Sequence, residues 1–400
     1  MSVESVVGDA AAARASTLNR VVKFHAPEIV FGPGATPEAA HAVLRLGGVR
    51  PLLVTDPGIA AAGWVDVVAA ELADCGLEPI IWDGLTPNPK DHEVAAGFEV
   101  YRDRECDVVV GLGGGSVMDA AKAIGTLAGN GGEILDFEGV DQASRPIPPL
   151  VMMPTTAGTG ADVSQFCIIT DSQRGIKMTI LGRSLVPDIT VIDPKLLVTM
   201  PDWLSAATGL DALTHGVEAV VSLAHNPLTD HHALRAVRAV VDTLERTLDD
   251  PNDMAARTVM AQAALDAGLA FTNAILGAAH AMSHQVGGML DLPHGQINGV
   301  LLPHVIRYNA EYDPHPYLPI ARSLGLAEPS MPASEAAVLV ADRIAQLAAS
   351  VGVPTGLAEM GVRVDDIDRL AKQSLEDACM ATNPRPSTVS EIADVFRAAL

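Results

Sequence analysis

Cysteine is scarce in this chain of 400 residues, which contains only Cys75, Cys106, Cys167 and Cys379. The four lie far apart and form no CxxC pair. This argues against a disulfide framework and against a zinc site built from cysteines. So sparse a use of cysteine suits a reducing compartment.

Basic residues are also few, since 26 Lys and Arg stand against 49 Asp and Glu and the formal net charge is −23. Such a chain repels nucleic acid and anionic membrane surfaces, so we expect neither as a partner. Residues 1–20 have no basic segment leading into an apolar core, and we expect a flexible tail there. No apolar run reaches the roughly 18 residues of a membrane helix. We therefore expect a soluble, cytoplasmic protein.

The chain does have enough apolar sequence, 48% of its residues, to bury a sizeable core. Short apolar runs alternate with helical stretches in the first half, at 51–56, 79–84, 106–115, 150–156, 166–171 and 189–194. Buried strands separated by helices are typical of a parallel α/β sheet.

Beyond MPDW (200–203), long stretches rich in alanine and leucine replace the strand-like runs. They predict helices, several of them buried. The last helix is predicted to begin at TVSE (388–391), where Thr388 and Glu391 fit a capping box. We expect two domains, an α/β domain over 21–200 and a helical domain over 201–400.

The segment GLGGGSVMDAAK (111–122) follows a strand and opens a helix. Backbone N–H groups at a helix start attract phosphate, and glycine lets a pyrophosphate approach closely. The loop matches neither GxGxxG, because residue 116 is Ser116, nor a P-loop. A tight turn without a ligand is the alternative interpretation.

A second glycine-rich loop, PTTAGTGADVS (154–164), also follows a strand. Two such loops at the same ends of parallel strands can enclose one extended ligand. Asp56 ends an earlier strand, where a carboxylate accepts hydrogen bonds from a ribose diol and repels a 2′-phosphate. These features predict a dinucleotide site that prefers NAD to NADP.

Histidine is concentrated in GAAHAMSHQVGGMLDLPHG (277–295), which holds three of the twelve histidines. His280 and His284 are four residues apart, as are Asp211 and His215 in GLDALTHGVEA, so each pair shares one face of a helix. His294 is predicted to lie at a bend. An Asp and two or three His can surround one divalent cation.

The histidines admit two other interpretations. The spacing HxxxH resembles a metalloprotease helix, but the general base expected after the first His is replaced by Ala281, which excludes a peptidase. A single histidine is most often a satisfied core residue, yet four ionisable groups within apolar helices are costly without a purpose. Gly287, Gly288 and Gly295 are interpreted as turns that return His294 towards His280.

Taken together, GGGSVMDAAK, PTTAGTG, TGLDALTHGVEA and the histidine-rich segment resemble the iron-containing alcohol dehydrogenase family. The similarity runs from FGPGA (31–35) to TNPRP (382–386). It implies an α/β dinucleotide domain, a helical metal-binding domain of the dehydroquinate synthase-like fold, and an active-site cleft between them. It also implies a homo-oligomer, a dimer or larger.

The resemblance also carries site residues over to this chain. The metal ligands fall on Asp211, His215, His280 and His294. The NAD contacts fall on Asp56, Asn88, Gly114, Gly115, Ser116, Asp119, Thr155, Thr156, Thr159, Lys177, Leu197 and the non-ligand His284. Cys167 and Phe271 match positions that line the substrate pocket. One departure is Asp162, where the family often has Glu.

The implied reaction interconverts a primary alcohol and its aldehyde by hydride transfer to NAD, with the alcohol oxygen bound to the metal. The family name indicates Fe²⁺, and Zn²⁺, Co²⁺ or Mn²⁺ are possible substitutes. His284 is the candidate proton carrier, with a water or ribose hydroxyl relay as the alternative. Lys122 either pairs with Asp119 or lies near the cofactor. The segment VSQFCIITDSQRGIKM most resembles the branch acting on methanol, ethanol and 1,3-propanediol.

Several rival functions share this fold or these motifs. A lyase of the dehydroquinate synthase type would need a basic cluster for its phosphorylated substrate, and no Lys or Arg occurs from 258 to 306. Glycerol-type and hydroxyacid dehydrogenases remain alternatives, and a maleylacetate reductase would not need all four ligands. A metal-binding scaffold without catalysis would have no use for two nucleotide loops.

Overall fold

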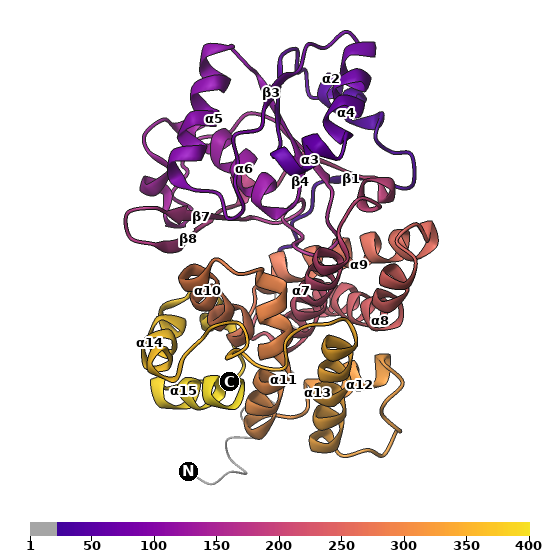
Figure 1. Ribbon diagram of the computed structural model, residues 1–400, viewed down its shortest axis with the longest axis vertical. Helices are drawn as coiled ribbons and strands as arrows, with labels where there is room; N and C mark the ends of the chain where they lie inside the picture. The colour runs from indigo at the N-terminus through magenta and orange to yellow at the C-terminus, as the bar shows by residue number, and fades with distance from the viewer. Residues whose placement is uncertain (1–21) are drawn as a thin grey trace. The chain divides into compact units, whose positions relative to one another are not determined.

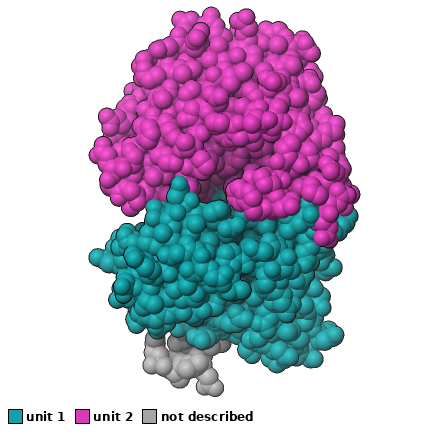
Figure 2. All heavy atoms as spheres, in the orientation of Figure 1, with its two compact units in different colours: residues 1–24, 206–248, 262–400 teal, residues 25–205, 249–261 magenta. Residues whose placement is uncertain are grey.

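The computed structural model describes residues 22–400, so the tail expected over 1–20 lies outside the described residues. The chain divides into two compact units, coloured separately in Figure 2. The α/β unit comprises His25–Ser205 and Asp249–Ala261. The helical unit comprises Ala206–Leu248 and Gln262–Leu400, together with residues 22–24.

The α/β unit is built on a sheet of six parallel strands in the order β1-β9-β6-β4-β2-β3. The strands are β1 (Glu28–Phe31), β2 (Pro51–Val54), β3 (Ile80–Trp82), β4 (Val108–Gly113), β6 (Leu150–Pro154) and β9 (Ile189–Ile192). Every residue of β2, β4, β6 and β9 is buried. Burial on both faces is why they read as continuous apolar runs rather than alternating ones. The parallel sheet expected from the sequence is confirmed.

Helices cover both faces of this sheet (Figure 1). One hydrophobic core contains residues of α2 (Glu38–Arg45) and α4 (Trp64–Asp74), and the other contains residues of α5 (Asp91–Asp103) and α6 (Gly115–Asn130). The short helix α3 (Pro57–Ala61) follows β2 directly, and η3 (Pro194–Leu197) follows β9. Strands sandwiched in this way are the doubly covered arrangement that parallel sheets require.

The run at 166–171 does form a strand, but the expectation that it joins the parallel sheet is wrong. Strand β7 (Phe166–Asp171) pairs antiparallel with β8 (Ile176–Leu181) in a separate sheet that β5 (Gly139–Val140) completes. The reason is the tight turn between them. The Asp171 carboxylate accepts from the backbone N–H groups of Gln173 and Arg174, and Gly175 takes a positive φ of 65°. Both features are typical of turns.

The helical unit contains helices alone among its described elements. They are α7 (Asp202–Val221), α8 (Pro227–Asp249), α9 (Met254–Ala274), α10 (Ala278–Leu290), α11 (His294–Tyr312), α12 (Tyr317–Ser323), α13 (Ala333–Ser350), α14 (Ile367–Glu376) and α15 (Val389–Ala398), with the 3-10 turns η4 (Val364–Asp366) and η5 (Ala378–Thr382). The first residues of α7 and of α9 belong to the α/β unit. The capping box predicted for the last helix is present, with Thr388 as N-cap and Glu391 at N3.

Helices α9 and α10 meet at a bend of 103°. Among the described residues, no single helix is long and apolar enough to cross a membrane, and only this bent pair meets both criteria when its two members are taken together. The linker includes Ile275, whose positive φ of 61° breaks the helix. The bend determines where the helix carrying His280 and His284 begins.

Candidate metal centre and dinucleotide site

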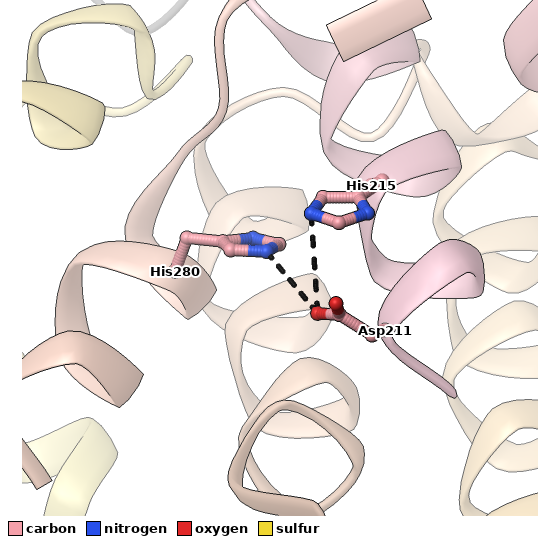
Figure 3. Close-up of side chains that lie close together, drawn as sticks. All are labelled: Asp211, His215 and His280. Carbon is pink, nitrogen blue, oxygen red and sulfur yellow. Dashed lines mark ion pairs between the residues drawn. The ribbon is translucent and has the colours of Figure 1, made fainter. Parts of the chain in front are cut away.

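Four ionisable side chains from three helices converge inside the helical unit. Asp211 and His215 lie one turn apart on α7, His280 is in the first turn of α10, and His294 is the first residue of α11. The Asp211 Oδ1 atom lies 3.6 Å from His280 Nε2, 3.9 Å from His215 Nε2 and 4.0 Å from His294 Nε2. Figure 3 shows the first three of these side chains, with His215 and His280 facing the carboxylate.

These separations suit one divalent cation. Two ligand atoms that each lie about 2.1 Å from the same cation in tetrahedral geometry are roughly 3.4 Å apart. The ligand atoms of Asp211, His215 and His280 all lie within 4.8 Å of one another, so these three side chains need only a modest inward shift to reach that spacing. His294 lies outside that group, and its Nε2 approaches Asp211 Oδ1 at 4.0 Å. One carboxylate with three imidazoles is also a chemically sound ligand set for Fe²⁺, Zn²⁺, Co²⁺ or Mn²⁺. The residues therefore fit a bound metal.

Burial and the neighbouring charges shift the pKa values of two side chains in this cluster. Asp211, His215 and His280 are 3%, 4% and 1% exposed. Burial alone would raise the pKa of Asp211, but the neighbouring His215, His294 and His280 outweigh it and hold the pKa below its usual range. Burial lowers the pKa of His280, whereas Glu218 and Asp211 reverse that effect and raise it to about 9. The two buried carboxylates, Asp211 and Glu218, carry negative charge that a bound cation would balance.

Glu218 is a neighbour of the candidate ligands that was missed from the sequence. It lies on α7, three residues after His215, and is 2% exposed. Its Oε1 accepts a hydrogen bond from the Ala279 backbone N–H at 2.7 Å, and its Oε2 lies 2.5 Å from His280 Nδ1. The helical spacing of three from His215 was a signal that could have placed Glu218 on the ligand face of α7.

Ser283 and Asn298 are two further neighbours missed from the sequence. Ser283 Oγ lies 3.1 Å from Nδ1 of His294. The side-chain amide of Asn298, on α11, donates to Asp211 Oδ1 at 2.8 Å and lies 3.2 Å from His280 Nε2. Its buried Oδ1 has no hydrogen-bond partner among the described residues. Asn298 follows His294 by four residues, so helical spacing again carried the signal.

His284 lies beside the four candidate ligands. Its ring stacks on His294 with 5.1 Å between centroids, and its Nδ1 lies 2.8 Å from Asp377 Oδ2. Burial would raise the pKa of Asp377, but His284 outweighs this and lowers it. Asp377 is 93 residues away along the chain, so no local pattern could have revealed this pair. With Cys379, they form a second group of potential metal-ligating side chains.

The two glycine-rich loops lie side by side in the α/β unit, because they follow β4 and β6, which are neighbouring parallel strands. A Cβ placed on Gly114 would lie 3.2 Å from Thr156 Cγ2, and one placed on Gly115 would lie 2.8 Å from Thr159 Cγ2. Glycine is therefore required for the close approach of these loops. The first loop begins α6, whose free N–H groups are suited to a phosphate.

Asp56 follows β2, the strand on the other side of β4. Its Oδ1 accepts a hydrogen bond from the Ile59 backbone N–H at 3.0 Å and so caps α3. Thr155, at the end of β6, donates its backbone N–H to Gly113, while its buried Oγ1 has no hydrogen-bond partner among the described residues. The predicted ribose and phosphate contacts thus lie along one edge of the sheet.

Asn88, Ser116 and Lys177 meet through hydrogen bonds. Lys177 Nζ, on β8, donates to Asn88 Oδ1 at 2.7 Å, and the Asn88 backbone N–H donates to Ser116 Oγ at 3.1 Å. Asn88 has a positive φ of 55°, a conformation that Asn tolerates well. Leu197 is buried at the end of η3, after β9, the strand that neighbours β6.

Lys122 is fully buried on α6, and its ammonium group holds the second loop. Nζ donates to the backbone oxygens of Ser164 at 2.7 Å and Phe166 at 2.9 Å. Burial lowers the pKa of Lys122 and raises the pKa of Asp119 to about 7 and that of Asp162 to about 6. These hydrogen bonds give Lys122 a structural role in the loop. That role is compatible with both predictions, that Lys122 pairs with Asp119 and that it lies near the cofactor.

The two predicted pocket residues lie in different units. Cys167 is 0% exposed on β7, and its thiol donates to the backbone oxygen of Asp119 at 3.2 Å. Phe271, on α9, stacks on the ring of His215 with 4.3 Å between centroids.

The glycines of the histidine-rich segment do not form the predicted turns. Gly287 and Gly288 are helical residues of α10, and Gly295 is the second residue of α11, so that expectation is wrong. The turn is made by residues 291–293, where Asp291 has a positive φ of 52°. Pro293 then precedes α11, which begins at His294.

Comparisons with known proteins cover nearly the whole chain. The family profile described as iron-containing alcohol dehydrogenase matches residues 26–194, and the profile for the C-terminal part of the Fe-containing alcohol dehydrogenase family matches residues 205–400.

Two relatives and one solved structure illustrate the similarity. A 1,3-propanediol dehydrogenase of Citrobacter freundii is 40% identical over 92% of this chain and 96% of the relative. An NAD-dependent methanol dehydrogenase of Bacillus methanolicus is 38% identical over 94% of this chain and 99% of the relative. A crystal structure of 1,3-propanediol oxidoreductase superposes with a TM-score of 0.93 at 39% identity, covering 95% of this chain and 100% of that one.

Proposed function

Because the chain belongs to the iron-containing alcohol dehydrogenase family, we propose that it interconverts short primary alcohols and their aldehydes with NAD and Fe²⁺. That the protein is an oxidoreductase acting on small alcohols and aldehydes, and using a metal and NAD(H), follows from the family. The proposal concerns the alcohol, the cation and the residues that carry out the reaction.

One observation carries the assignment of the reacting centre: three imidazole Nε2 atoms lie within 4.0 Å of a single oxygen of Asp211. We assign Asp211, His215, His280 and His294 as the ligands of the cation. When bound, the cation supplies a Lewis acid that stabilises alkoxide charge, and NAD supplies the hydride acceptor. The Asp211 carboxylate offsets part of the cation's charge.

We assign proton transfer to His284. The Asp377 carboxylate accepts from Nδ1–H of His284, which leaves its Nε2 as a proton acceptor. Asp377 therefore fixes both the orientation and the tautomer of the ring. A relay through water or a ribose hydroxyl is the competing route, and both routes deliver the proton to solvent.

We assign NAD to the edge of the parallel sheet. Gly114, Gly115 and the start of α6 would receive the pyrophosphate. The hydroxyl of Thr155, which has no hydrogen-bond partner among residues 22–400, offers a donor there. The Oδ1 atom of Asp56 caps α3, so Oδ2 remains available to accept hydrogen bonds from a ribose diol. The remaining predicted contacts, Ser116, Asp119, Asn88, Thr156, Thr159, Lys177 and Leu197, lie in the segments described above.

The substrate and the assembly are proposed from the relatives. Two of them are named for methanol and for 1,3-propanediol, which supports a short primary alcohol as the substrate. We place Phe271, which stacks on the ring of His215, next to the alcohol. A role for Cys167 in the substrate pocket stays a prediction from the resemblance. We also propose a homo-oligomer, which light scattering on the purified protein would measure directly.

The decisive experiment measures NADH formation with a panel of alcohols of one to four carbons, before and after treatment with a chelator. We expect turnover with at least one primary alcohol, loss of turnover with the chelator, and recovery on adding Fe²⁺. Replacing His280 or Asp211 by Ala should abolish activity and cation binding together. A protein that binds the cation but oxidises none of the alcohols would contradict the proposal.

A further inference from the structure

Both carboxylate oxygens of Glu218 have partners within the protein. It is 2% exposed, Oε1 accepts from the Ala279 backbone N–H at 2.7 Å, and Oε2 lies 2.5 Å from His280 Nδ1. The first bond satisfies an N–H group in the first turn of α10, which has no partner within its own helix. The second bond reaches one of the proposed metal ligands on the side facing away from the other three.

This arrangement determines which nitrogen of His280 carries a proton. A carboxylate is only an acceptor, so the hydrogen between Glu218 and His280 belongs to Nδ1. A neutral ring then has a lone pair on Nε2, the atom that lies 3.6 Å from Asp211 Oδ1. The amide of Asn298 gives independent support, because its Nδ2 is a donor and lies 3.2 Å from the same Nε2.

We propose that Glu218 is a positioning residue for the metal centre: it holds His280 as the Nδ1–H tautomer and so presents the Nε2 lone pair to the cation. The inference rests on the proposed function, since it requires the four ligands assigned above. Carboxylates in this outer position raise the basicity of a ligating imidazole and fix its orientation, and their loss commonly weakens metal affinity about 10- to 100-fold.

The substitution Glu218→Gln separates the two bonds of this side chain. Because the Ala279 N–H is a fixed donor, the carbonyl oxygen of Gln must face it, and the amide NH₂ must then face His280. An NH₂ group donates to Nδ1, which moves the ring hydrogen to Nε2 and removes the lone pair that binds the cation. The helix cap is kept, so the metal-free variant should unfold close to the wild-type temperature.

The substitution Glu218→Ala is expected to cost more stability and less cation affinity than Glu218→Gln. It removes the bond to Ala279 and leaves a cavity, so it should lower stability more than Gln does. The ring of His280 is then free to choose either tautomer, and cation binding selects the productive one. A purely structural role predicts that affinity follows stability, with Ala the worse variant. The proposal predicts the reverse order of affinities, with Gln the worse.

The experiment measures the Zn²⁺ and Co²⁺ affinities of the full chain by competition with a chromophoric chelator, and the unfolding temperature of each metal-free variant. We expect Gln to weaken binding about 10- to 100-fold and Ala to weaken it less. The matched control is Asp266→Asn, which changes another buried carboxylate that contacts an imidazole, His232 Nδ1 at 2.8 Å. It should leave the affinity unchanged.

The outcomes distinguish the inference from the function it rests on. If the wild-type protein binds neither ion, the proposed metal centre is wrong. If the wild type binds them and Glu218→Gln binds equally well, or Ala is weaker than Gln, only the role of Glu218 is wrong. A Gln variant that fails to fold also contradicts the role, because the retained bond from Ala279 should keep α10 in place.

Discussion

At the scale of single residues, the site depends on groups that do two things at once. Asp56 caps α3 through the Ile59 N–H and is assigned to a ribose diol, and Glu218 caps α10 while it holds His280. Such residues cannot be judged by a substitution that removes both roles. A useful variant retains one hydrogen bond and changes the other, as Asn does for Asp.

The first prediction concerns Asp56. Asp56→Asn keeps an oxygen for the cap of α3, since Asn is as good an N-cap as Asp, but removes the charge that repels a 2′-phosphate. We expect kcat/KM with NADP to rise relative to NAD, with little change in unfolding temperature. Asp56→Gly should shift the preference similarly and cost only a few tenths of a kcal/mol in the cap. An unchanged preference in both variants would show that Asp56 does not contact the ribose.

At the scale of elements, the close approach of two helices determines the positions of the proposed ligands. Helix α11 starts with His294, and the next residue, Gly295, packs against the backbone of α7. A Cβ at Gly295 would lie 1.9 Å from the Ala207 backbone oxygen and 3.1 Å from Asp211 Cβ. The glycine therefore lets the two helices that carry the proposed ligands approach closely enough to bring His294 to Asp211.

The second prediction is that Gly295→Ala separates these helices. The obstructing atom is a backbone oxygen rather than a flexible side-chain tip. We therefore expect the free energy of unfolding to fall by about 1–3 kcal/mol or more. Cation affinity should fall as well. The matched control is Gly288→Ala, an exposed position within α10 with nothing within 4 Å of the added Cβ. It should gain up to about 1 kcal/mol. Normal cation binding by Gly295→Ala would contradict this account.

At the scale of the whole molecule, buried carboxylates influence how global stability responds to pH. Asp162 is 6% exposed, and burial raises its pKa from 3.8 to about 6. As the pH rises from about 4 to 6, the unfolded chain loses this proton before the folded protein does. Unfolding is thereby favoured, and the contribution of Asp162 to stability falls as the pH rises through this window.

The third prediction follows from that sign. Asp162→Asn removes this titration. Between about pH 4 and pH 7, the unfolding free energy of the variant minus that of the wild type should therefore increase, by about 3 kcal/mol at most. Urea denaturation at several pH values measures the difference. Asp368→Asn, at a carboxylate whose side chain is 85% exposed, should run parallel to the wild type. A parallel curve for Asp162→Asn would contradict the prediction.

Much of the site could be predicted because its information is local. Spacing of four residues along a helix puts Asp211 and His215 on one face, and a glycine loop between strand and helix indicates an anion site from its composition and position alone. The residues that contact the proposed ligands were harder to predict from the sequence. Glu218 and Asn298 are in helical register with ligands, yet only the folded chain shows that they contact His280 and Asp211.

The alternation of strands and helices, the helical second half, the candidate ligand types and the family resemblance could all be predicted from the amino-acid sequence. Each of them follows from short-range periodicity, residue chemistry or the wording of a motif. The folded chain was needed to show that β7 forms a hairpin with β8 outside the parallel sheet, and that α9 and α10 meet at 103°. The Asp377–His284 contact belongs to the same class. Contacts between segments tens of residues apart depend on how whole helices pack, and no local pattern encodes that packing.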